Sequence, residues 1–222
     1  MKRSIITTGD GSKTIHIEEW NEQYHSKHGA VNEAYHVFID QGLSRINKTN
    51  VAILEIGFGT GLNALITAME GKKRELEIYY TAVEKYPITV DELEQLCYTE
   101  QLNAPLFQEI FNKMHASSWE KNVLVSPKFT IHKQCKDFQD IDDTDAYDLV
   151  YFDAFGARVQ PELWTETIFL KMFKALKAHG ILVTYAAKGS VRRAMQSVGF
   201  TVERLPGPPG KREMLRATKL SN

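Results

Sequence analysis

The sequence predicts an α/β fold built on a doubly wound, mostly parallel sheet with a small N-terminal extension. Residues 51–63 read VAILEIGFGTGLN, in which an apolar run ends in an acid and precedes three alternate glycines and a second apolar segment. That order is typical of a strand, a tight turn and a helix that seat a nucleotide-like ligand. From residue 51 onward strand-like and helix-like segments alternate, which indicates a parallel sheet covered by helices.

The chain is expected to divide into an extension over 1–50 and a main domain over 51–222. In the extension, 14–17 is predicted as a strand of a small hairpin after a Gly-Asp-Gly turn, and 33–43 as a helix that ends near Gly42. Aromatic residues such as Trp20 and Phe38 are expected mainly in the core of this extension.

The main domain is predicted to alternate strands and helices in a regular order. Strands are expected at 51–56, 76–83, 129–132, 147–152, 181–185, 200–204 and 214–217. Helices are expected at 62–69, 89–96, 164–176 (closed by His179-Gly180) and 190–198 (closed by Gly199). Acids lie at or just beyond four strand ends, where open α/β sheets bind their ligands: Glu55, Glu84, Asp137 and Asp153.

The composition is that of an ordinary globular protein and contains no run of about 18 apolar residues that would cross a membrane. The basic N-terminus is not followed by the apolar core of a signal peptide. Cys97 and Cys135 are expected to be free thiols, which favours a reducing cytoplasm. No His or Cys spacing indicates a metal site; His25 and His28 lack a third ligand.

Charge is unevenly distributed although the net charge is only −1. The C-terminal quarter is basic, with Lys188, Arg192, Arg193, Arg204, Lys211, Arg212, Arg216 and Lys219 against Glu203 and Glu213. Such a segment suits phosphate contacts, and the alternative is a solvated helix and loop surface.

The glycine turn is similar to motif I of the class I S-adenosylmethionine (SAM) methyltransferases, in which an acid precedes Gly-x-Gly-x-Gly. Gly57, Gly59 and Gly61 have this spacing, whereas the dinucleotide fingerprint requires a glycine where Leu62 stands. Glu84 ends the second strand and is expected to bind both ribose hydroxyls of the cofactor. The alternative for Glu84 is a capping or surface acid.

Three further residues are assigned to the cofactor. Asp137 is expected to meet the adenine amino group, with Asp140 as a competitor and a helix N-cap as the alternative. Glu55 is expected either to contact the cofactor's ammonium group or to bond the loop backbone. Asn63, just after the last glycine, completes this set.

Asp153 ends the fourth strand, at the place where SAM enzymes that act on amines carry an Asp or Asn followed by a turn and an aromatic residue. A carboxylate there accepts the N–H bonds of an amine, aims its lone pair and stabilises the charge that develops on nitrogen. Asp153 is therefore the predicted catalytic residue. Phe155 is predicted to wall the acceptor pocket or stack on a base, with a core position as the alternative.

Several segments together carry a family resemblance: NEQYHSKHGAVNEAYHVFI (21–39), LEIGFGTGLNAL (54–65), AVEKYP (82–87), YFDAFGARVQPELW (151–164), GSVRRAMQSVGF (189–200) and GPPGKREMLR (207–216). They resemble the methyltransferase module of the bifunctional bacterial tRNA 5-methylaminomethyl-2-thiouridine biosynthesis proteins and its stand-alone relatives. The resemblance implies a SAM-dependent fold and methylation of the primary amine of 5-aminomethyl-(2-thio)uridine at the tRNA wobble position.

The same resemblance implies several residue roles. Tyr24 helps to close the cofactor pocket, and Lys211 and Arg212 lie near the site. With Arg192 they are the predicted substrate contacts, to the anticodon arm of a tRNA. The family's oxidase module is not expected in this sequence, so either another enzyme supplies the aminomethyl group or the chain uses a different amine.

The sequence departs from the family pattern just after Asp153, where Gly156-Ala157 and Arg158 replace the expected residues. This departure bears on the acceptor specificity and does not change the methyltransferase prediction. Two other functions are alternatives. One is a transferase acting on a free small amine, as the polyamine synthases do, although Arg158 is expected to repel a polycationic acceptor. The other is a binding module without catalytic activity, which the acids at four strand ends disfavour.

Overall fold

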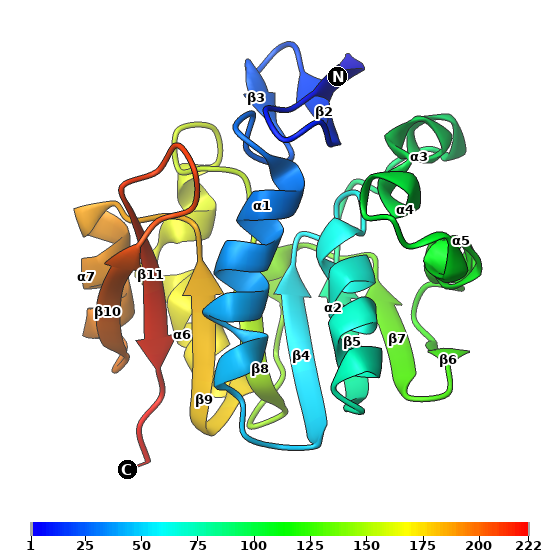
Figure 1. The fold of residues 1–222 in the computed structure, drawn as a ribbon. Coiled ribbons are helices and arrows are strands. Elements are labelled where there is room, and N and C mark those ends of the chain that lie inside the picture. Colours follow the sequence, from blue (N-terminus) through cyan, green and yellow to red (C-terminus); the bar gives the residue numbers. More distant parts are fainter. Residues whose placement is uncertain (1, 222) are drawn as a thin grey trace.

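The computed structural model describes residues 2–221, in which eight strands form the main sheet in the order β10-β11-β9-β8-β4-β5-β7-β6 (Figure 1). Its centre is parallel: β4 (Asn50–Ile56), β5 (Glu77–Val83), β7 (Phe129–Gln134), β8 (Tyr147–Phe152) and β9 (Leu176–Thr184). Antiparallel strands lie at its edges: β6 (Asn122–Ser126), β10 (Thr201–Pro206) and β11 (Glu213–Thr218). The predicted fold class is confirmed, and all seven strands predicted for the main domain are present.

Helices cover both faces of this sheet, which makes it doubly wound (Figure 1). One face packs against α2 (Leu62–Lys73) and α1 (Ala30–Ala34), which continues as a π-helical stretch, Tyr35–Asp40. The other face packs against α6 (Glu166–Ala175) and α7 (Gly189–Ser197). The two hydrophobic clusters follow from the period of two along the strands: in β4, Ile53 lies in one cluster and Leu54 in the other.

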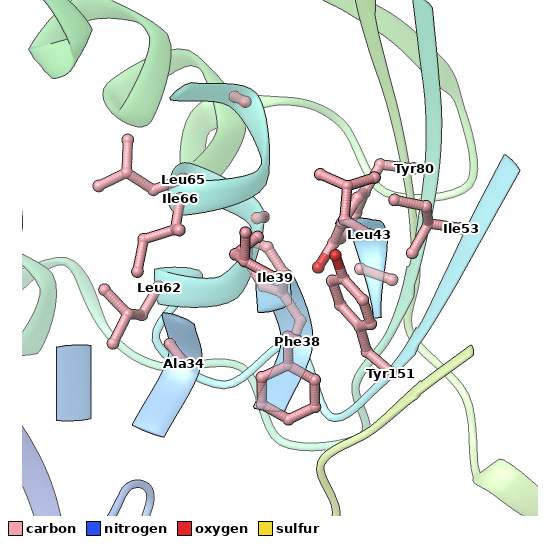
Figure 2. Packing of buried hydrophobic residues seen from close by; sticks show 14 of the residues in the cluster. Ala34, Phe38, Ile39, Leu43, Ile53, Leu62, Leu65, Ile66, Tyr80 and Tyr151 are labelled. Carbon is pink, nitrogen blue, oxygen red and sulfur yellow. The ribbon is translucent and has the colours of Figure 1, made fainter. Parts of the chain in front are cut away.

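Figure 2 shows how the π-helical stretch is held against the sheet. The ring of Phe38 lies 5.0 Å from that of Tyr151 on β8, and both belong to the cluster that also contains Ile53 and Tyr80. Phe38 is therefore part of the main core rather than of a separate core of the extension, which corrects that expectation. The domain boundary at residue 50 stays a prediction.

The N-terminal residues also build a small antiparallel sheet of β1 (Arg3–Thr7), β2 (Lys13–Ile17) and β3 (Glu22–Gln23). The predicted hairpin is present, with β1 as its partner strand. This sheet lies beyond the carboxyl ends of the parallel strands, near the β10–β11 loop (Figure 1). It is therefore placed over the edge where a ligand is expected.

The segment between β5 and β7 holds more structure than the sequence predicted. The predicted helix is present as α3 (Val90–Leu96), which begins with a capping box of Thr89 and Glu92. Two further helices follow, α4 (Tyr98–Gln101) and α5 (Gln108–Ala116), and then the edge strand β6. Short 3-10 turns complete the chain: Leu43–Arg45, Pro105–Phe107, Phe138–Asp140 and Pro161–Trp164.

The predicted end of the helix over 164–176 is wrong. Helix α6 stops at Ala175, and β9 begins at once at Leu176, so His179-Gly180 lies inside the strand. His179 has a φ of 63°, and the pairing of β8 with β9 shifts register between Tyr147 and Leu149. His179-Gly180 therefore belongs to a bulge in β9. The left-handed backbone conformation of His179 is part of this bulge and does not mark the end of a helix.

Among the helices within residues 2–221, none is both long and apolar enough to span a bilayer. Cys97 and Cys135 are free thiols, as predicted.

Candidate active site

One cavity opens at the carboxyl ends of β4, β5 and β8 and is closed on one side by the N-terminal sheet. Most of the predicted cofactor and catalytic residues line it: Tyr24, Gly57, Gly59, Asn63, Glu84, Asp137, Asp153 and Phe155. Residues predicted from five separate stretches of sequence thus meet in one place.

The glycine loop after β4 forms the floor of the cavity. Gly57 has a φ of 91°, and a Cβ there would lie 3.0 Å from the carbonyl oxygen of Asp153. Gly59 has a φ of 50°, and a Cβ would lie 3.0 Å from the ring of Tyr24. Both positions therefore require glycine. Gly61 does not line the cavity; it is the N-cap of α2, with His115 packed against it.

Glu84 holds the loop from the neighbouring strand. Its carboxylate accepts hydrogen bonds from the backbone N–H of Gly59 at 3.0 Å and of Tyr86 at 2.8 Å. Each oxygen keeps a lone pair for another donor. An acid fixed in this way at the end of the second strand suits the two hydroxyls of a ribose.

Asp137 lies further along the same cavity, at the end of β7. It caps the turn Phe138–Asp140 by accepting from the backbone N–H of Gln139, and it pairs with Lys85 at 2.8 Å. The backbone hydrogen bond and the Lys85 ammonium hold the pKa of Asp137 below its usual value. The N-cap alternative is therefore present, and it leaves the carboxylate at the cavity wall. Asp140 does not line the cavity.

Asp153 lines the cavity directly after the end of β8. Its Oδ2 accepts a hydrogen bond of 2.8 Å from the side-chain amide of Asn63, which also donates to Glu55 Oε1 at 3.0 Å. Burial, with a contribution from the nearby Glu33 carboxylate, raises the pKa of Asp153 to about 7. The carboxyl group can therefore take up and release a proton near neutral pH.

Glu55 does not line the cavity, so the structure gives no contact from it to a cofactor ammonium group. Its side chain is fully buried beneath the glycine loop. Of the two alternatives left by the sequence, the geometry favours a structural hydrogen bond, although the partner is Asn63 rather than the loop backbone.

Aromatic side chains form the wall beside Asp153. The rings of Trp20 and Tyr24 pack edge-on against Phe155, with centroids 5.4 and 4.9 Å away. All three line the cavity, so the expectation that Trp20 lies in a local core is wrong. β3 and its turn carry Trp20 over the carboxyl ends of the strands, a placement that depends on tertiary structure.

Arg158 holds this wall in place. Its guanidinium donates to the backbone carbonyls of Trp20 and Asn21 and pairs with Glu22 at 2.9 Å. Arg158 does not line the cavity. The expectation that Arg158 repels a cationic acceptor is therefore wrong, because its charge is engaged by the turn that it clamps.

None of the three basic residues predicted as substrate contacts lines the cavity. Lys211 forms an ion pair with the buried Glu33 and lies 3.7 Å above the ring of Tyr185. Arg212 is exposed in the β10–β11 loop, and Arg192 is half-buried on α7. Any contact of these three with a substrate is a prediction.

Sequence reasoning missed several residues that line the cavity, among them Arg3, His25, Lys85, Tyr86, Phe138, Gln139, Gln160, Glu162 and Leu163. Lys85 and Tyr86 follow Glu84 directly, so their position next to a predicted site residue could have identified them. Burial lowers the pKa of His25 to about 4, so its imidazole is neutral near pH 7 and hydrogen-bonds Thr14.

Known proteins match this chain in sequence. Residues 112–220 match the family described as S-adenosyl-L-methionine-dependent methyltransferase. The tRNA 5-methylaminomethyl-2-thiouridine biosynthesis bifunctional protein MnmC of Actinobacillus pleuropneumoniae is 30% identical, over 91% of this chain and 33% of that protein. The MnmC protein of Burkholderia thailandensis is 31% identical, over 96% of this chain and 34% of that protein. The chain spans about a third of the length of these relatives.

Solved structures match the fold. The crystal structure of MnmC2 from Aquifex aeolicus superimposes with a TM-score of 0.76 and 22% identity, over 100% of this chain and 72% of that one. Spermidine synthase from Thermotoga maritima gives a TM-score of 0.60 at 13% identity, over 98% and 69%. The fold is that of these two proteins, and the sequence matches to MnmC proteins confirm the resemblance inferred from the motifs.

The residues that line the cavity fit SAM. Its floor is the glycine loop, where a Cβ at Gly59 would meet the Tyr24 ring. Because Gly59 has no Cβ, the loop backbone can approach a ligand closely. Glu84 and Asp137 present acceptor oxygens that suit the ribose hydroxyls and the adenine amino group, and the Asp153 carboxylate suits a ligand with a cationic sulfonium.

Proposed function

We propose that this chain, an S-adenosyl-L-methionine-dependent methyltransferase by its fold and by its family match over residues 112–220, methylates the primary amine of a 5-aminomethyl-(2-thio)uridine at the wobble position of tRNA. The observation that carries the proposal is the Asp153 carboxylate, exposed to the cavity beside the glycine loop. The sequence similarity to MnmC proteins over nearly the whole chain supports tRNA as the substrate.

Asp153 has the chemistry that amine methylation requires. An aminomethyl group is cationic at neutral pH and has no lone pair until it loses a proton. A carboxylate whose pKa is raised to about 7 can accept that proton and then a hydrogen bond from the neutral amine. SAM supplies the methyl group: the C–N bond forms as the C–S bond breaks, and its electron pair stays on sulfur. Once Asp153 has released that proton to solvent, it is a carboxylate again and stabilises the charge of the new ammonium.

The proposed cofactor contacts extend from one end of the cavity to the other. Glu84 binds the ribose hydroxyls, and Asp137 meets the adenine amino group. The backbone of Gly57 and Gly59 lies against the methionine part, and Tyr24 covers it. The aromatic wall at Phe155 then borders the acceptor, where a base flipped out of the anticodon loop would stack.

Basic residues at the same edge of the sheet are proposed to bind the anticodon arm. Within residues 2–221, Lys188, Arg193 and Arg212 are exposed and form no ion pair. Three other basic residues of the C-terminal quarter are neutralised by acids: Arg204 by Glu213, Arg216 by Glu203 and Lys219 by Asp145. A separate enzyme that makes the aminomethyl group and a cytoplasmic location belong to the same proposal.

The experiment is methyl transfer from labelled SAM to bulk tRNA from cells that lack the modification, followed by nucleoside mass analysis. One methyl gained on 5-aminomethyl-(2-thio)uridine supports the proposal. Asp153→Asn is expected to bind SAM and lose turnover, whereas the exposed Asp140→Asn serves as the matched control. Methylation of a free polyamine in the absence of tRNA labelling would favour the small-amine alternative instead.

A further inference from the structure

Glu55 is an acid at a position where the sheet is otherwise apolar. Its neighbours in β4 at the same spacing, Ile53 and Val51, belong to the cluster under α1 and α2, and Glu55 itself is fully buried. Glu55 Oε2 and the hydroxyl of Tyr80 on β5 are both buried without a hydrogen-bond partner of good geometry. An ionised carboxylate in such surroundings is strongly disfavoured.

The partner of Glu55 is Asn63, in the first turn of α2. The two N–H bonds of its amide are directed to two different carboxyl groups, Glu55 at 3.0 Å and Asp153 at 2.8 Å. The opposite orientation would place the amide oxygen against two carboxyl groups, so the hydrogen bonds define which end is the NH2. Asn63 is almost fully buried, and its hydrogen bond is the only one to the Asp153 carboxyl group found within residues 2–221.

We propose that Asn63 is a positioning residue that holds the Asp153 carboxylate toward the acceptor amine, and that Glu55 serves as the neutral acid on which Asn63 is anchored. The chain Glu55–Asn63–Asp153 then carries a single negative charge, on the group that faces the cavity. The catalytic part of this inference rests on the proposed methyl transfer. It differs from the sequence-based assignment of Glu55 and Asn63 to the cofactor.

Electrostatics support this arrangement. Burial raises the pKa of Glu55 well above its usual value, and the Asp153 carboxylate raises it further. The hydrogen bonds from Asn63 lower the pKa of both carboxyl groups, against the effect of burial. Other titratable groups also act on this chain: Glu33 on α1, Tyr80 on β5, Glu84 just after β5, Tyr185 after β9 and Lys211 in the β10–β11 loop.

The test is a 13C carboxyl NMR titration of wild type and Asn63→Ala, with Asp153→Asn and Glu55→Gln used for assignment. We expect Asp153 to titrate near the value of about 7 in the wild type and at higher pH in Asn63→Ala, and Glu55 to stay protonated. An Asp153 midpoint that does not move, or a Glu55 resonance at the ionised position, would overturn the inference. This readout does not depend on the acceptor, so it stands even if tRNA is not methylated.

Kinetics separate positioning from cofactor binding. In Asn63→Ala we expect kcat to fall by at least about tenfold, the KM for SAM to stay within about threefold, and the acidic limb of kcat to move to higher pH. A raised KM with unchanged kcat would make Asn63 a cofactor contact and refute the inference.

A second variant covers the case in which Asn63→Ala does not fold. Glu55→Gln has nearly the shape of the neutral acid and keeps an oxygen to accept from Asn63. We expect Asp153 to titrate at the wild-type pH in this variant, because replacing a neutral acid by an amide changes no charge. An Asp153 midpoint that moves to lower pH would mean that Glu55 is ionised in the wild type, contrary to the inference.

Discussion

Glu84 and Gly59 are joined by a hydrogen bond of 3.0 Å from the backbone N–H of Gly59 to the Glu84 carboxylate. The acid at the end of β5 therefore fixes the turn of the glycine loop after β4, in addition to facing the cavity. This hydrogen bond couples the ends of two strands, so loss of the carboxylate would release the glycine loop and also remove the proposed contact to the cofactor ribose.

Glu84→Ala is accordingly expected to weaken SAM binding by more than a contact to one hydroxyl would explain, at least about tenfold. Glu84→Gln keeps an oxygen for Gly59 and is expected to bind with intermediate affinity. Isothermal titration calorimetry checks both, with the exposed Glu94→Ala on α3 as the control. Equal SAM affinity in Glu84→Ala and wild type would rule out the ribose assignment.

Substitutions at two glycines can distinguish the cost of backbone strain from an effect on ligand binding. Gly59 and Gly11 both have positive φ, at 50° and 83°, but a Cβ at Gly59 meets the Tyr24 ring whereas nothing lies within 4 Å at Gly11. Substitution by alanine is expected to cost each variant about 1–2 kcal/mol of unfolding free energy from strain alone.

Only Gly59→Ala is expected to lose SAM binding as well. Chemical denaturation measures the shared strain, and calorimetry measures the ligand effect. Should Gly11→Ala lose SAM affinity to the same extent, the effect would come from general destabilisation and the role of the loop as the cavity floor would be refuted.

Much of this site could be predicted from sequence because it follows from local rules. A strand, a glycine turn and a helix define the loop, and acids at strand ends such as Glu84 and Asp153 must meet at one edge of a parallel sheet. The hydrogen bonds from Asn63 to Glu55 and to Asp153 could not be predicted from the sequence, since they depend on the rotation of α2 over the sheet.

The sequence was least informative where elements are short. Helices α4 and α5 and strand β6 fill the segment between β5 and β7, and none has a long periodic pattern. The prediction for Arg158 failed for a different reason. Its position soon after Asp153 suggested a place near the acceptor site, but its side chain is long enough to reach the turn at Trp20–Glu22.

The clamp by Arg158 has a measurable consequence. Arg158→Ala is expected to loosen the turn that carries Trp20, because three hydrogen bonds to residues 20–22 are lost together. Hydrogen–deuterium exchange should then rise in 13–24, and SAM affinity should fall by about threefold to tenfold. The exposed Arg193→Ala is the control for loss of positive charge. Unchanged exchange in 13–24 would argue that the turn holds itself in place.

Basic residues at opposite edges of the sheet are expected to differ in tRNA binding. Arg193 and Arg212 are exposed and form no ion pair within residues 2–221, whereas Lys219 is paired with Asp145 beyond the amino end of β8. Arg193→Ala and Arg212→Ala should each weaken tRNA binding and reduce the salt slope by about one, and Lys219→Ala should do neither. Equal effects of all three would place the tRNA elsewhere.

Asp153 is expected to make stability depend on pH with a defined sign. Burial raises the pKa of Asp153 from 3.8 to about 7 in the folded chain. Between these two pH values the folded state therefore holds a proton that the unfolded state releases. Stability must then fall as pH rises through the window. Asp153→Asn removes this loss, so its Tm relative to wild type should increase between about pH 5 and pH 8.

Asp137→Asn is the matched control for that experiment. The pKa of Asp137 is lowered from 3.8, so its contribution to stability is fully present above that value and is lost only in more acidic solution. The Tm difference between Asp137→Asn and wild type should therefore stay constant between about pH 5 and pH 8. If the Asp153→Asn difference is equally flat, Asp153 is ionised across the range, and it cannot be the base that takes a proton from the amine near neutral pH.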